Sequence, residues 1–266
     1  MPGLTRYYRT MSEILQRKLP YDPLSPRPLP GIGPLADRDW LRIDEAYGEQ
    51  MAEKARLLAR DRGKVLAMDE DARSAAEELL AEVVEALCEH HGCQRAGDRI
   101  TRPDGVQVRC DDADPMATLA QLTQEDFCIL EKHGDEHVMT AAALCFPASW
   151  SLDEKFMHPL IGIHTTVDEY DAGLARRVQR LFDGVQVGRP MWRFNALWYA
   201  DAALHQPRRT TDRRVQQDPA RANFMRSELQ TIRRLAKTGA VVFGIHTYVL
   251  ARADVEAMTE EEQAQQ

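Results

Sequence analysis

The chain has 266 residues, of which 44% are apolar and 29% charged, and its formal net charge is −8. These values are ordinary for a globular protein, and the acidic balance argues against a nucleic-acid binder, which needs a basic face to neutralise phosphates. The N-terminus has no apolar stretch flanked by positive charge, and no run of about 18 apolar residues occurs, so neither a signal peptide nor a membrane span is predicted. We therefore expect a cytoplasmic protein.

Cysteine usage agrees with that location. The cysteines are odd in number and include no C-x-x-C pair, so neither a disulfide framework nor a cysteine metal site is expected. They are interpreted as reduced thiols, at Cys88, Cys93, Cys110, Cys128 and Cys145.

The N-terminal part is predicted to be an extended leader followed by a helical layer. Residues 19–34 read LPYDPLSPRPLPGIGP, and proline at this density breaks helices and strands, so residues 1–36 are expected to lie along the surface. Asp37 can cap a helix whose apolar residues recur at helical spacing as far as Met51. A second helix is predicted from about Asp71 to Glu89, because its apolar residues fall on one side.

The middle of the chain changes to the two-residue period of strands. Apolar and polar residues alternate in Val106–Cys110. Two apolar runs, Phe127–Leu130 and Val138–Phe146, flank the short turn His133–Asp135, which predicts a β-hairpin.

Helix and strand signals alternate after the hairpin. Ser151 and Glu154 have the spacing of a capping box, which predicts a short helix. A longer helix is predicted from about Asp171 to Phe182, and Trp192–Tyr199 is predicted to be a strand.

The C-terminal part is predicted to contain one more helix and one more strand. Asp218–Pro219 suits a helix start, and Gly239 suits its end. The apolar stripe of this helix is Phe224, Met225, Ile232 and Leu235. Ala240–Val249 is predicted to be the final strand.

Helices followed by strands interleaved with helices predict an α+β fold with a mainly antiparallel sheet. We expect a single domain over residues 37–252 and a polar tail over residues 253–266. No internal repeat and no glycine-rich phosphate loop is visible, so a nucleotide site is not predicted.

His164 is the first candidate site residue. Its neighbours are apolar, so its imidazole is expected near the core, where a neutral imidazole is a good ligand for heme iron. The alternative is a core histidine bonded to a backbone carbonyl.

Glu228 is the second candidate. It falls on or beside the apolar stripe of the helix predicted from Asp218, where a carboxylate is costly unless it is paired. Arg226, Arg233 and Arg234 are near it in sequence, and Arg193 can come from the preceding strand, so a structural ion pair is possible. The alternative is a carboxylate that faces a ligand pocket.

His246 is the third candidate. In a strand it shares a face with Gly244 and Tyr248, and a glycine leaves room there for a flat ligand. The alternative is an exposed polar face of a sheet.

Four blocks, spread over roughly residues 30–250, resemble one known family. They are Asp39–Leu41, Glu125–Lys155, Pro159–His164 and Met225–Phe243. In these blocks the chain is similar to the heme-dependent oxidative N-demethylase alpha-subunit family.

The resemblance implies a PAS-like sheet that holds heme b. It also implies oxygen-dependent removal of a methyl group from a small secondary amine as formaldehyde, with electrons from reductase subunits that carry flavin and an iron–sulfur centre. Under this interpretation His164 is the iron ligand. The implied catalytic residues are Glu228, Arg193 and His246. The implied cofactor-binding residues are His164, Arg226 and Tyr248.

The chain departs from the family pattern at Leu229, where arginine is usual, and at Ala236, where proline is usual. If that arginine belongs to the pocket, its loss favours an alternative function, a non-catalytic heme- or small-molecule-binding PAS-like module.

Overall fold

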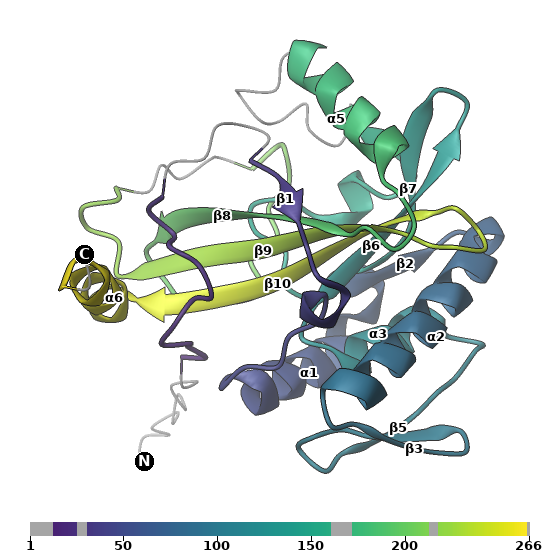
Figure 1. Cartoon of the computed structure of the whole chain (residues 1–266), viewed down its shortest axis with the longest axis horizontal. Helices are drawn as coiled ribbons and strands as arrows, with labels where there is room; N and C mark the ends of the chain where they lie inside the picture. The colour runs from purple at the N-terminus through teal and green to yellow at the C-terminus, as the bar shows by residue number, and fades with distance from the viewer. Residues whose placement is uncertain (1–12, 26–30, 161–171, 213–217, 265–266) are drawn as a thin grey trace, which may run out of the picture.

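The computed structural model describes residues 13–25, 31–160, 172–212 and 218–264. These residues form one large antiparallel sheet, a small three-stranded sheet and flanking helices (Figure 1). The prediction of an α+β fold with a mainly antiparallel sheet is therefore confirmed.

The large sheet has seven strands. In spatial order they are β1 (Gly33–Pro34), β8 (Met191–Tyr199), β9 (Phe224–Arg234), β10 (Val241–Ala251), β6 (Asp126–His133), β7 (Glu136–Ala143) and β2 (Leu66–Met68). When the five long strands are numbered along the chain, they lie in the order 2-1-5-4-3 of a PAS-like sheet. The final strand thus lies in the middle of the sheet. The strands β6 and β7 form the predicted hairpin, which turns at Gly134 with a φ of 63°.

Three helices cover one face of the sheet, which we call the helical face (Figure 1). They are α1 (Tyr47–Val65), α2 (Arg73–His90) and α3 (Pro115–Leu122). Leu79, Val83 and Leu87 recur along α2 and are buried against Phe127 and Ile129 of β6. The predicted helix at about 71–89 is thereby confirmed.

Shorter elements connect these helices. They are the 3-10 turns η1 (Asp37–Asp39) and η2 (Glu70–Ala72) and the small sheet of β3 (Gln94–Ala96), β4 (Arg99–Thr101) and β5 (Gln107–Arg109). Among the described residues, no helix combines the length and the apolar character that crossing a bilayer requires.

The opposite face of the sheet carries a second apolar cluster. The helix α5 (Ala172–Gly184) and the 3-10 turn η3 (Leu152–Glu154) supply Phe182 and Leu152 to it, and the strands supply Ile232 and Ile245. Leu160, the last described residue before the gap at 161–171, is buried in the same cluster.

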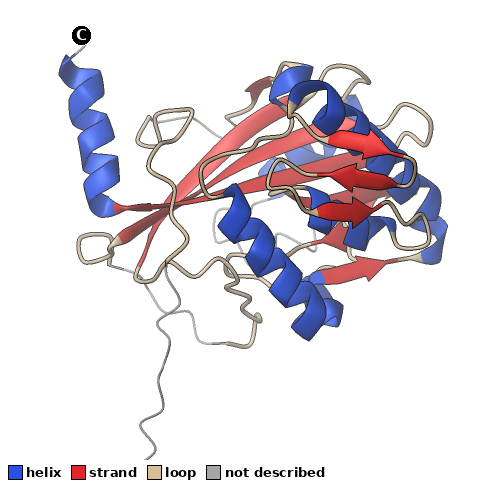
Figure 2. Ribbon diagram, turned by 90° about the horizontal axis from the view of Figure 1, so that it is seen from below, coloured by secondary structure: helices blue, strands red, loops and turns tan. Residues whose placement is uncertain are grey.

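The far ends of β8, β9 and β10 pack on their helical-face side against a third cluster. Leu19 and Tyr21 of the N-terminal segment contact it, and so does Val255 of α6 (Arg252–Ala264). Figure 2 shows α6 standing out from the end of the long strands. The tail predicted from residue 253 is thus a helix that begins with a buried apolar anchor.

The helix predicted from Asp218 is wrong, because Phe224–Arg234 is the strand β9. It pairs with β8 on one side and with β10 on the other. Since both of its faces are largely covered, its apolar residues do not alternate with polar ones, and the two-residue period is hidden. Gly239, taken as a helix end, lies at the β9–β10 turn with a φ of 74°.

The helix predicted from Asp37 also begins later, at Tyr47. Only Asp37–Asp39 forms a short 3-10 turn. Asp44 accepts a hydrogen bond from the backbone N–H of Ala46, two residues on, a local bond that favours a turn over a helix.

Gly244 marks the tightest approach in the sheet. A Cβ atom there would lie 2.6 Å from Oγ1 of Thr231 and 3.4 Å from the Phe127 ring. Gly244→Ala is therefore expected to lower the free energy of unfolding by about 1–3 kcal/mol through overpacking. Gly63→Ala, in a helix with open space around it, should instead be neutral or stabilising by up to about 1 kcal/mol. Urea denaturation of both variants tests this, and equal effects would contradict it.

Candidate active site

A row of polar side chains lies on the face of β8 and β9 that points away from the helical face. Side chains alternate along a strand, and the register pairs Arg193 with Gln230 and Asn195 with Glu228. The same alternation places Arg226 beside them. We call Arg193, Asn195, Arg226, Glu228 and Gln230 the Glu228 face.

Glu228 is buried and held by amides. Its Oε2 accepts hydrogen bonds from Asn195 Nδ2 at 3.2 Å and from Gln230 Nε2 at 3.0 Å. Asn195 Oδ1 also accepts from the backbone N–H of Glu228 at 3.2 Å. The carboxylate is therefore fixed in direction, as a group that orients a ligand must be.

Arg226 is the nearest cation to this carboxylate. Its Nε lies 3.7 Å from Oε1 of Glu228. Its terminal nitrogens donate to the backbone oxygens of Phe146 at 2.6 Å and Leu204 at 2.9 Å. These bonds anchor two loops to β9 and hold the guanidinium in place, so the ion pair that the sequence suggested for Glu228 is made with Arg226.

Arg193 has a different environment. Its Nε is buried, and no hydrogen bond joins it to another described residue. Burial lowers the pKa of the Arg193 guanidinium, and the charge of Glu228 opposes that shift. A buried N–H group without an acceptor is costly in a folded protein.

The second apolar cluster continues from the Glu228 face on the same side of the sheet. Ile232 follows Glu228 and Gln230 at two-residue spacing, and Ile245 lies beside Gln230. Polar groups next to an apolar surface are typical of small-molecule sites. His164 lies outside the described residues.

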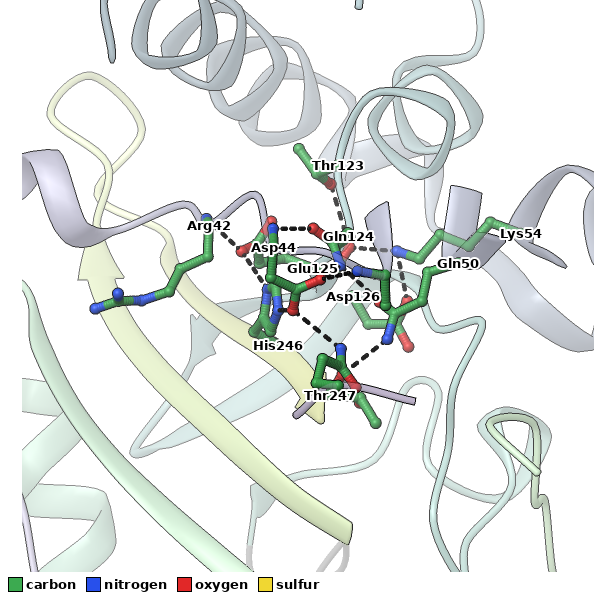
Figure 3. A network of polar contacts seen from close by, with 12 residues as sticks. Arg42, Asp44, Gln50, Lys54, Thr123, Gln124, Glu125, Asp126, His246 and Thr247 are labelled. Carbon is green, nitrogen blue, oxygen red and sulfur yellow. Dashed lines mark hydrogen bonds and ion pairs between the residues drawn. The ribbon is translucent and has the colours of Figure 1, made fainter. Parts of the chain in front are cut away.

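His246 points to the helical face and is held between two carboxylates (Figure 3). Its Nδ1 lies 2.9 Å from Oε1 of Glu125, and its Nε2 lies 3.0 Å from Oδ2 of Asp44. The imidazole is 1% exposed, so no solvent separates these charges. We call these three residues the His246 clamp.

Further polar groups surround the clamp (Figure 3). Gln124 donates to Oδ1 of Asp44 at 2.8 Å, and Gln16 donates to Oδ2 of the same carboxylate at 2.9 Å. Lys54 is fully buried, lies 3.0 Å from Asp126 and donates to the backbone oxygen of Glu125. The clamp therefore joins the N-terminal segment, α1, β6 and β10.

The pKa of His246 reflects this geometry. Burial lowers it, but the hydrogen bonds and charges of Asp44 and Glu125 outweigh burial and raise it to about 9. The pKa of Asp44 is raised by burial, yet its bond to His246 and the two glutamine bonds bring it below its usual value. A protonated imidazole between two carboxylates results.

The clamp predicts a loss of stability at alkaline pH. Because the folded pKa of His246 lies above its unfolded value of about 6.5, its contribution is complete below that pH and is lost as the pH rises through about 9. The loss should reach about 3 kcal/mol, which urea unfolding at pH 6 and pH 9.5 measures. His246→Asn should flatten this decline, and an equally steep decline in that variant would contradict the assignment.

Tyr248 and Leu229 also point to the helical face. Tyr248 packs edge-on against Tyr21 with ring centroids 6.3 Å apart, and burial raises the pKa of its phenol. Leu229 is 2% exposed within the third cluster. Glu228, Arg193 and Arg226 are thus together, whereas His246 and Tyr248 lie on the other side of the sheet.

Two further observations concern other places on the described residues where a ligand or a metal could bind. An open depression of about 570 Å³ lies between β1 and the loop before β8, lined by Gly33, Gln186 and Arg189 among others, and none of the Glu228 face borders it. Within the part of the chain that the structure describes, no three His, Cys, Asp or Glu side chains form a metal-binding group. A heme needs only one protein ligand, so this finding does not bear on it.

A PAS-like sheet with a polar face beside an apolar cluster is an arrangement typical of small-molecule-binding domains. A comparison with known protein families shows to which family the domain belongs. Residues 31–266 match the model of the family described as haem-dependent oxidative N-demethylase, alpha subunit-like. The match covers most of the chain, and the chain belongs to this family.

Proposed function

We propose that this chain binds heme b and carries out the oxygen-dependent oxidative demethylation of a small secondary amine. The observation that supports it most is Glu228, a buried carboxylate held by Asn195 and Gln230 beside an apolar cluster. Membership of the family supports the binding of heme and the class of reaction in this proposal.

The described residues fit a heme. A porphyrin is flat and apolar with carboxylates at one edge. On one side of the sheet a buried apolar cluster lies near Arg193, whose Nε has no acceptor among the described residues. His164 would supply the axial nitrogen, and Arg226 remains a predicted cofactor contact. Tyr248 lies on the other side of the sheet, which weighs against its predicted contact with a heme at the Glu228 face. When bound, the heme would supply the oxidising chemistry, which no amino-acid side chain provides.

Glu228 is proposed to hold the ammonium of the amine. A carboxylate fixed in a partly dry site attracts a cation more strongly than it would in water. Its two amide donors stop it from turning away, and Arg226 restrains it from behind. Arg193 is proposed to position the substrate from the neighbouring strand.

A catalytic role for His246 stays a prediction, and its placement favours a structural one. Its ring is shielded from the Glu228 face by the sheet, and both of its nitrogens already have carboxylate partners. An oxygen-using subunit also needs electrons, so we propose reductase subunits with flavin and an iron–sulfur centre as partners.

The second candidate function is a binding module without turnover. Its support from the sequence is Leu229, which stands where the family usually has arginine. Because Leu229 points to the helical face, an arginine there would not join Glu228, and this weakens the case for lost catalysis. Heme binding with amine-induced spectral change but no formaldehyde would favour the module.

The absorption spectrum of the purified protein tests the proposal, before and after hemin and dithionite. We expect a Soret band that shifts on reduction, and formaldehyde release when an amine, oxygen and an electron donor are added. His164→Ala should change the spectrum, with His158→Ala as the control. A protein that takes up no hemin would overturn the proposal.

A further inference from the structure

Charge on the Glu228 face is not balanced within the described residues. Arg193 and Arg226 are cations, and Glu228 is the only anion of the five residues that define the face. The ion pair between Arg226 and Glu228 uses one cation and one anion. One positive charge, on Arg193, is left over.

Glu228 is not turned to neutralise Arg193. Its Oε2 is occupied by Asn195 and Gln230, and its Oε1 faces Arg226. Diagonal neighbours on adjacent strands have Cβ atoms about 7–8 Å apart, so Arg193 is near Glu228 without bonding to it. The carboxylate instead remains fixed by its other partners.

The Arg193 side chain is also not simply solvated. Its Nε is buried and has no acceptor among the described residues. The guanidinium is planar and matches a carboxylate with two parallel hydrogen bonds. Such a group, half-buried beside a ligand-facing row, suits an anion brought from outside the chain.

We propose that Arg193 binds a carboxylate of the ligand that occupies the Glu228 face, an inference that rests on the proposed function. Two carriers share this chemistry. One is a zwitterionic substrate, an N-methylated amino acid whose amino group lies at Glu228 and whose carboxylate lies at Arg193. The other is an edge carboxylate of the heme.

Arg193→Gln tests the proposal, with Arg193→Lys as the conservative variant and Arg221→Gln, at an 89% exposed side chain, as the matched control. Calorimetry compares N-methylglycine with N-methylethylamine, which has a similar size but no carboxylate, on the protein as purified. Soret titrations compare hemin with hemin dimethyl ester.

We expect Arg193→Gln to lower the affinity for one carboxylate probe about 10- to 100-fold, while the affinity for the matching probe without a free carboxylate changes little. Loss of the preference for N-methylglycine identifies the substrate as the carrier, and loss of the preference for hemin over its ester identifies the heme. The lysine variant should retain part of the preference.

Unchanged preferences in both comparisons, in a variant with the wild-type unfolding midpoint, would overturn the proposal. The calorimetric comparison needs no heme. A wild-type protein that takes up no hemin but shows Arg193-dependent binding of N-methylglycine would therefore reject the proposed function and keep this inference. Absence of both would reject both.

Discussion

Replacing His246 with alanine is expected to lower the free energy of unfolding by about 3–5 kcal/mol, because it leaves two buried carboxylates without their shared cation. Asp44 and Glu125 both contact the ring, and no other described cation contacts their carboxylates. The total stability of a domain is commonly about 5–15 kcal/mol, so this substitution should remove a large part of it.

A thermodynamic cycle gives the sharper test. Asp44→Asn in the wild-type background should destabilise, because it removes an ion pair. In the His246→Ala background the same substitution should restore part of the lost stability, because it removes an unpaired buried charge. His133→Ala, at an exposed hairpin position, is the control. Additive effects of the two substitutions would show that the clamp residues do not act together.

Glu228→Gln is expected to lower kcat/KM for amine demethylation by about 100-fold or more, which corresponds to about 3 kcal/mol of lost stabilisation. The amide has the shape of the carboxylate but carries no charge for an ammonium. Hemin affinity should change little, because the substitution removes no predicted cofactor contact.

Formaldehyde release and amine-induced spectral change measure this effect separately from heme binding. Glu89→Gln, at a 66% exposed side chain on α2, is the control for the substitution itself. If Glu228→Gln retains wild-type turnover, the amine must be held elsewhere, and the assignment of Glu228 is wrong.

Local patterns predicted the hairpin of β6 and β7 and the helix α2. The hairpin of β6 and β7 was visible because Gly134 and Asp135 interrupt two apolar runs, and α2 was visible because Leu79, Val83 and Leu87 follow the helical period. In both cases the signal lies within a few residues of sequence, because a turn between apolar runs and helical spacing are both local.

The strand β9 was missed because its environment is set by distant elements. Its charged residues, Arg226 and Glu228, are buried only because the loops at Phe146 and Leu204 and the strand β8 come to lie beside them. A single strand without alternation resembles a helix in sequence, and tertiary packing decides between the two.

The candidate site was predictable in its residues but not in its arrangement. Glu228, Arg226 and Arg193 were identified as neighbours by charge, and they share one face. The clamp had no local signal, because Asp44 and Glu125 are 202 and 121 residues from His246. Alternation along the strand correctly predicts that His246 and Tyr248 share one face. The sequence does not show which layer of the fold covers that face.

The central position of β10 has a consequence for synthesis on the ribosome. The strand follows every other strand of the sheet in the chain, yet it separates β6 from β9 in the sheet. Until it emerges, the nascent chain holds two partial sheets, each with an open edge, and Asp44 and Glu125 lack their cation. Nascent chains stalled before residue 241 should therefore leave the sheet unclosed and depend on chaperones.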